Sequence, residues 1–146
     1  MKKLFRPFLM VATVATLFVV SSCTKTCDEG YEGTDCKTLI REKFIGQFKG
    51  PETCTIGNDN YTVTVTGASS DLLSIVINNA YNQNFTVTGK VDGSSLTVAE
   101  QSVGSVGSKL SGSGSISGDG KTLTFTYTVT PATGTANTCT YVGTRL

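Results

Sequence analysis

Residues 123–129 read Leu-Thr-Phe-Thr-Tyr-Thr-Val, so that every second side chain is large and apolar. A period of two is typical of a β-strand that packs one face on a core and exposes the other. The same alternation recurs along the chain, and threonine or serine often takes the outer positions, as a half-buried antiparallel sheet favours. The eight predicted strands are residues 44–48, 61–66, 73–77, 85–91, 96–98, 110–116, 123–129 and 139–144.

Short segments rich in Gly, Asn, Asp and Pro join these strands, for example at residues 57–60, 118–120 and 131–137. Short connections indicate antiparallel neighbours in an up-and-down meander. Eight strands suffice to close into a small barrel that holds side chains or one small ligand. We therefore expect an all-β domain at residues 43–146, either a closed eight-stranded antiparallel barrel or a two-sheet sandwich.

The first 22 residues are typical of a targeting segment. A basic start is followed at residues 7–20 by an apolar run that falls short of the roughly 17–25 residues of a membrane-spanning helix. The sequence then reads Val-Ser-Ser-Cys at residues 20–23, which resembles the lipobox of bacterial lipoproteins. The resemblance implies a signal peptide at 1–22, cleavage before Cys23 and lipid on Cys23. An ordinary secretory signal followed by a disulfide cysteine is the alternative.

Lipid on Cys23 would make the membrane a partner of this chain. Each buried CH₂ group contributes about 0.8 kcal/mol, and two or more acyl chains anchor a protein stably. We therefore expect an outer-membrane lipoprotein of the cell envelope that faces the periplasm or the surface. Export also places the chain in an oxidising compartment, where the other four cysteines form disulfides in one of three pairings.

Residues 27–36 read Cys-Asp-Glu-Gly-Tyr-Glu-Gly-Thr-Asp-Cys. This stretch resembles the closing loop of an EGF-like module, C-x-x-G-Y-x-G-x-x-C, without the four other cysteines of a complete module. The resemblance implies a Cys27–Cys36 bridge within a lipid-anchored spacer at 23–42, and no growth-factor activity. Cys54 and Cys139 are then left as the second pair, and a bond between them would join the two ends of the sheet that barrel closure brings together.

Residues 43–48, Lys-Phe-Ile-Gly-Gln-Phe, resemble the first strand of lipocalin-like barrels, in which a Gly-x-Trp motif lies near the barrel floor. Phe48 stands in place of the tryptophan. In lipocalins a basic residue near the last strand often covers this aromatic ring, and the resemblance implies Arg145 for that role. Arg145 either binds an anionic ligand or caps the barrel end, and we expect the cap. The Arg-Glu-Lys-Phe-Ile-Gly opening at residues 41–46, after the EGF-like stretch, also resembles small bacterial surface lipoproteins with β-domains of uncharacterised function, and this resemblance covers most of the mature chain.

The composition excludes several classes of chemistry. Histidine is absent from the sequence, which removes Ser-His-Asp triads, Cys–His dyads and most zinc sites. The formal net charge of +1 gives no sign of a nucleic-acid partner. The acids that we assign to turns or strand ends are Glu52, Asp59, Asp71, Asp92 and Asp119. No two of them share a strand face at close spacing, as a glycosidase pair would require. We expect no enzyme activity, no catalytic residue, no metal and no cofactor.

Two kinds of function remain. The first is a binding or interaction module that holds a protein, a glycan or a small apolar ligand near the membrane. The alternative is a structural envelope component without a ligand cavity. A cavity lined by the inward residues would favour the first. A packed interior of Phe44, Phe85, Phe125 and Tyr127 would argue against a ligand carried inside.

An asparagine-rich tip surrounds Tyr81, with asparagine at positions 78, 79, 82 and 84. Such a tip is either a polar recognition surface or ordinary turn chemistry. We expect turn chemistry here.

Overall fold

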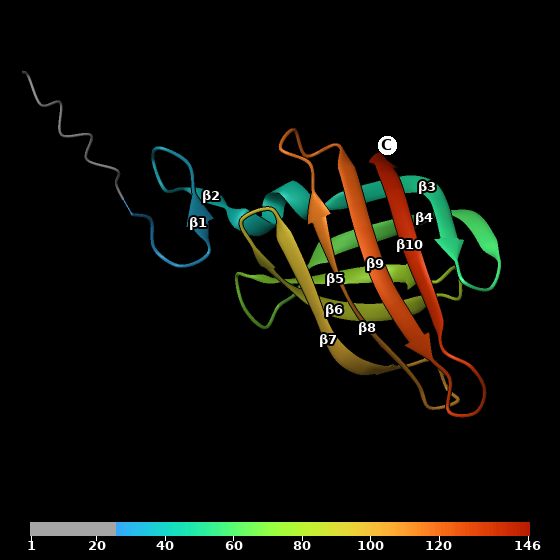
Figure 1. Cartoon of the computed structure of the whole chain (residues 1–146). Coiled ribbons are helices and arrows are strands. Elements are labelled where there is room, and N and C mark those ends of the chain that lie inside the picture. Colours follow the sequence, from blue (N-terminus) through green and yellow to red (C-terminus); the bar gives the residue numbers. More distant parts are fainter. Residues whose placement is uncertain (1–25) are drawn as a thin grey trace, which may run out of the picture.

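The computed structural model describes residues 26–146, so that the predicted signal peptide and Cys23 lie outside the described part. Nearly all of this part is β-structure (Figure 1). The elements are β1 (Tyr31–Glu32), β2 (Thr38–Leu39), the 3-10 helix η1 (Ile40–Phe44), β3 (Gly46–Cys54), β4 (Asn58–Gly67), β5 (Ser74–Ala80), β6 (Phe85–Asp92), β7 (Ser95–Val103), β8 (Ser108–Ile116), β9 (Thr122–Thr130) and β10 (Asn137–Arg145). Within residues 26–146, no helix has the length and apolar character needed to cross a bilayer.

Strands β3 to β10 form a closed antiparallel barrel in which each strand pairs with the next in sequence. The barrel closes where β10 pairs with β3, with Cys139 opposite Cys54 and Arg145 opposite Phe48. The predicted eight-stranded meander is therefore confirmed, and it closes into a barrel rather than splitting into a sandwich. Closure pairs both edges of the sheet, so each strand keeps a neighbour on both sides.

The two ends of the barrel differ. We call the end that carries η1 and the turns at 68–73, 93–94 and 117–121 the floor. We call the other end, with the turns at 55–57, 81–84, 104–107 and 131–136, the mouth. In Figure 1, β1, β2 and η1 lie on the left beside the floor, and the β9–β10 connection of the mouth is at the lower right.

The barrel interior is filled by the inward side chains of the alternating strands. Phe44, Phe125 and Tyr127 are buried in this core, together with Phe48 of β3, Tyr141 of β10 and aliphatic residues from each of the strands β4 to β9. Phe85 is only half-buried and lies at the start of β6, at the mouth. Each large apolar side chain buried in this way contributes about 1.5–3 kcal/mol. The packed interior argues against a ligand carried inside the barrel.

The first strand of the barrel begins later than predicted. Phe44 belongs to η1 rather than to a strand, and its fully buried side chain closes the floor. Gly46 then starts β3 with φ of +142°, a conformation that side-chain-bearing residues rarely adopt, and a Cβ there would collide with the Arg145 guanidinium. The alternation of residues 44–48 alone does not predict this 3-10 helix, because a buried apolar residue at position 44 is compatible with a helix as well as with a strand.

Residues 27–36 form a disulfide loop, closed by the Cys27–Cys36 bond, that lies against the floor. Lys43 Nζ of η1 lies 2.7 Å from Glu32 Oε2 in the loop. Arg41 Nη1 donates to the carbonyl oxygens of residues 68 and 71, both at 2.8 Å, and so fixes η1 to the β4–β5 turn. The chain thus enters the barrel from the floor end.

Candidate binding site at the mouth of the barrel

The β5–β6 connection at the mouth has an unusual backbone. The register of the two strands shifts between Asn78 and Ala80, which makes Asn79 an extra, bulged residue. Asn79 (φ 63°) and Tyr81 (φ 59°) then adopt the left-handed conformation, as do Asn82 and Asn84. Asparagine tolerates this conformation, whereas for a tyrosine it costs on the order of 1–3 kcal/mol. Bulges are common at barrel rims, where they redirect a side chain.

Four contacts hold Tyr81 in this position. Its backbone N–H donates to Tyr61 Oη at 3.1 Å, and its own Oη accepts a hydrogen bond from Asn137 Nδ2 at 2.9 Å. Its ring stacks on Phe85, with centroids 6.1 Å apart, and meets Tyr127 edge-on at 6.4 Å. The half-buried Tyr81 ring is therefore fixed at the mouth before any ligand arrives.

The asparagines around Tyr81 make the hydrogen bonds that are expected of turn residues. Asn79 Nδ2 donates to Thr62 O at 3.0 Å, and Asn79 Oδ1 accepts from the Asn84 N–H at 3.1 Å. Asn82 Nδ2 donates to Asp59 Oδ2 at 2.6 Å. Tyr81 and Asn82 are themselves the central residues of a β-turn, in which the Gln83 N–H donates to Ala80 O at 3.4 Å and both central residues have positive φ. Asn, Asp and Gly are the usual residues at such positions, so a tyrosine at the first of them is unusual.

Glu52 lies beneath this tip, inside the barrel. It was expected at a strand end; it stands two residues before the end of β3, points inward and is 3% exposed. Its Oε1 accepts hydrogen bonds from Tyr61 Oη, at 2.6 Å, and from Tyr127 Oη. Burial raises the pKa of both tyrosines well above the usual value, and their hydrogen bonds to Glu52 raise it further. The sequence contains a sign of this burial: Glu52 is four residues after Phe48, and residues at even spacing in a strand point to the same face of the sheet.

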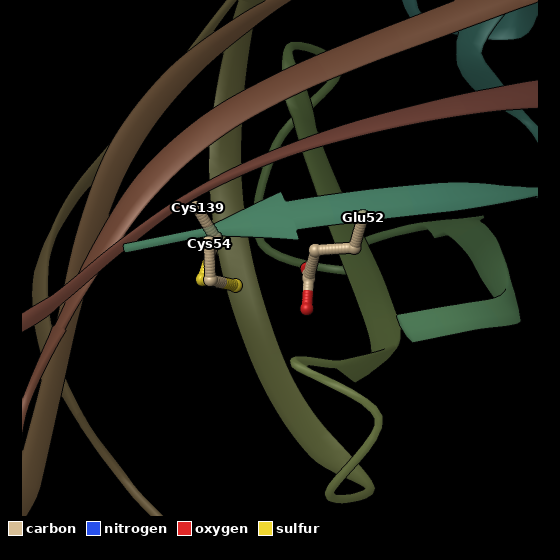
Figure 2. Close-up of side chains that lie close together, drawn as sticks. All are labelled: Glu52, Cys54 and Cys139. Carbon is tan, nitrogen blue, oxygen red and sulfur yellow. A yellow bond between two sulfur atoms is a disulfide. The ribbon is translucent and has the colours of Figure 1, made fainter. Parts of the chain in front are cut away.

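The Cys54–Cys139 disulfide lies next to Glu52, on the same side of β3 (Figure 2). The two sulfurs and a carboxylate oxygen of Glu52 lie within 4.8 Å of one another. Metal ions bind thiolates, and here the sulfurs are bonded to each other. The oxidised pair leaves the Glu52 carboxylate as the single ligand of this group, which is too little for a metal centre.

Two open hollows flank Tyr81 at the mouth, and both are also lined by Ile56 and Gln83. The first, of about 170 Å³, is completed by Glu52, Cys54, Gly57, Asn58 and Asp59. The second, of about 240 Å³, is completed by Phe85, Ser108, Val129, Pro131, Thr135 and Asn137. Asn137 joins the loops around them, because its Oδ1 accepts from Ile56 N at 2.9 Å while its Nδ2 bonds Tyr81.

A larger hollow, of about 540 Å³, lies between the disulfide loop and the barrel wall at the floor end. Its polar lining includes Asp28, Glu29 and Asp92, with Lys90 as the one cation among the lining residues. None of its non-glycine lining residues in the described chain adopts a left-handed φ. The mouth, with its fixed aromatic ring and buried polar network, is the better candidate although its hollows are smaller.

The structure brings Phe48 and Arg145 together at the floor. The Arg145 Cζ lies 4.6 Å from the centre of the Phe48 ring. Arg145 Nε donates to Gly120 O at 2.7 Å, Nη2 to Lys43 O at 2.5 Å, and Nη1 to the carbonyl oxygen of Ile45. Each of the three guanidinium nitrogens thus donates to a backbone carbonyl oxygen of the floor, so Arg145 acts as a cap rather than as an anion-binding group.

The Cys27–Cys36 and Cys54–Cys139 bonds are both present, and Cys23 lies outside the described residues. Sequence reasoning missed the inward position of Glu52 and the role of Tyr81. No family model, curated protein or solved structure matches the chain. The candidate site therefore rests on its geometry.

Proposed function

We propose that this chain is a cell-envelope lipoprotein, anchored in the outer membrane through lipid on Cys23, that acts as a binding module. Its ligand is taken at the mouth of the barrel rather than inside it. The observation that carries this proposal is Tyr81, which is held in a left-handed conformation between two open hollows. Strained residues of this kind cluster at ligand sites. No catalytic group or cofactor is part of this role.

The end of the barrel at which the described chain begins is compatible with such an anchor. The described chain starts at the floor, where the disulfide loop contacts η1. A nine-residue strand such as β3 spans roughly 30 Å along its own direction. A lipid on Cys23 would attach at the floor side and leave the mouth directed away from the membrane, open to a partner.

The alternative is a structural envelope component without a ligand. The packed core is compatible with it, since no space for a ligand is needed inside the barrel. It gives no reason, however, for a half-exposed tyrosine at a turn position where Asn, Asp or Gly would be free of strain. The binding module is therefore favoured.

The anchor is tested by replacing Cys23 with alanine in the full-length chain. We expect loss of metabolically incorporated palmitate and release from the membrane fraction. A Cys27→Ala, Cys36→Ala variant is the matched control and should keep its label. Membrane retention of a cleaved Cys23→Ala protein would contradict the lipid anchor.

The binding role is tested by hydrogen-exchange mass spectrometry of the full chain in detergent, with and without envelope extract. We expect added protection at residues 81–84 and 131–137. Protection confined to residues 27–31 and 90–97 would move the site to the floor hollow. No protection at any segment would favour the structural alternative.

A further inference from the structure

We infer that the mouth recognises a neutral saccharide, through stacking on Tyr81 and Phe85 and hydrogen bonds to the side chains around them. This inference rests on the proposed function and names the ligand class for the same site. It begins from the combination of an aromatic face with amide, hydroxyl and carboxylate groups around two adjacent hollows.

The aromatic part of the site is Tyr81 with Phe85. Their rings lie nearly parallel, with an interplanar angle of 20°, and both side chains are half-buried. The C–H-rich face of a sugar ring is apolar and packs on an aromatic ring, while its hydroxyl groups point outward from the edge. Because Tyr81 is already fixed by Tyr61 and Asn137, stacking on it loses little side-chain entropy.

The polar part of the site surrounds these rings. Gln83 is exposed and lines both hollows, with Asn58 in the first and Thr135 in the second. Amides donate and accept at the same time, and hydroxyls do so as well. Neighbouring hydroxyl groups of a sugar also donate and accept, so these side chains match them in hydrogen-bonding character.

The charges at the mouth select against acidic ligands. Among the described residues that line the two hollows, Glu52 and Asp59 are the charged side chains, and neither lysine nor arginine is present. A phosphate, sulfate or uronic acid would therefore face negative charge with no cation to balance it. The ligand that fits is neutral.

A small apolar ligand fits this lining less well. It would cover the amides of Gln83 and Asn58 without offering them a hydrogen-bond partner. A polar group buried without a partner costs about 1–3 kcal/mol. A saccharide replaces the water on these amides with hydroxyl groups and avoids that loss.

The test is isothermal titration calorimetry of the full chain in detergent. The neutral ligands are maltohexaose, xylohexaose and mannohexaose, and hyaluronan fragments are the acidic counterpart. We expect binding of at least one neutral hexasaccharide and none of hyaluronan. Gln83→Ala should weaken that binding about tenfold, which corresponds to the loss of a shared hydrogen-bonding group. Tyr81→Leu should abolish it.

The matched control is Gln47→Ala, which removes an exposed amide from the outer face of β3 near the floor and should leave binding unchanged. Gln83 is exposed and has an ordinary backbone conformation, so Gln83→Ala keeps the test valid if Tyr81→Leu does not fold. Binding of none of the three neutral sugars, binding of hyaluronan alone, or binding unaffected by Gln83→Ala would overturn the inference.

Failure of the inference is distinguishable from failure of the proposed function. Periodate destroys vicinal diols, so periodate treatment of the envelope extract should remove the added hydrogen-exchange protection at residues 81–84. Protection that survives periodate but is lost after protease treatment of the extract would point to a protein partner. That result would overturn the saccharide while leaving the binding role of the mouth intact.

Discussion

Cys54 and Cys139 stand directly opposite each other across the seam between β3 and β10, although they are 85 residues apart in the chain. Their bond joins the first strand of the barrel to the last. It therefore fixes, by a covalent link, the contact on which barrel closure depends.

Removal of this bond by Cys54→Ala and Cys139→Ala should lower the free energy of unfolding by about 4–5 kcal/mol in the chain-entropy model, because the unfolded chain gains the freedom of a long open loop. Urea unfolding followed by circular dichroism measures this loss. The Cys27→Ala, Cys36→Ala variant opens a loop of only nine residues outside the barrel and should leave the barrel transition nearly unchanged. Equal losses in the two variants would contradict this view of the seam.

Arg145→Met should destabilise the barrel by about 1–3 kcal/mol, since the methionine keeps the apolar stem but leaves the floor carbonyls without their charged donor. Arg145→Lys should recover little, because an ammonium group does not reproduce the planar fork of a guanidinium. Lys121→Met, an exposed change at the same end, is the control. Wild-type stability of Arg145→Met in urea would show that the cap is dispensable.

Glu52→Leu should destabilise the protein by about 1–3 kcal/mol. The Tyr61 and Tyr127 hydroxyls lie 3.3 Å apart, so without the carboxylate one can donate to the other, and one buried donor is left without an acceptor. Tyr127→Phe should cost less stability in the Glu52→Leu background than in the wild type, because the hydrogen bond between Tyr127 and Glu52 is already absent there. A double-mutant cycle between Glu52→Leu and Tyr127→Phe, measured by urea unfolding, gives the coupling energy. Strict additivity of the two changes would mean that the hydrogen bond between them contributes nothing to stability.

Stability should fall at high pH because of the buried tyrosines. Burial raises the pKa of Tyr141 to about 12, and raises the pKa of Tyr61 and Tyr127 as well. The unfolded chain loses these protons from about pH 10 upward while the folded chain retains them, so the unfolded state binds fewer protons. The stabilisation is complete below pH 10 and is lost above it, by up to about 1.4 kcal/mol per pH unit for each tyrosine.

Urea unfolding at a series of pH values between 8 and 11 measures this slope. Tyr141→Phe should make it shallower, whereas Tyr31→Phe, in the disulfide loop, should not. A free energy of unfolding that stays constant through pH 11 would contradict the prediction.

The strand pattern of the sequence was sufficient to predict the eight-stranded antiparallel meander, because inward and outward positions alternate through each strand. It left a barrel and a sandwich open, and the pairing of β10 with β3 decides for the barrel. Glu52 shows the limit of this reasoning. Pro51 and the acid itself break the apolar pattern near the end of β3, although parity with Phe48 places Glu52 inside. Tyr81 shows another limit, since a bulge at Asn79 depends on pairing between β5 and β6 that no local pattern specifies. Phe44 lies in η1 rather than in a strand, and a single buried apolar residue in the sequence does not distinguish these two elements.

The pairing of β10 with β3 has a consequence for crowded surroundings. An open sheet offers a row of free backbone groups onto which another chain can add a strand, and this is a common route to aggregation. Between Gly46 and Arg145 every strand has neighbours on both sides, so such growth has no starting point. Association between copies at high concentration would therefore use loops or the outer wall rather than the addition of strands to the barrel.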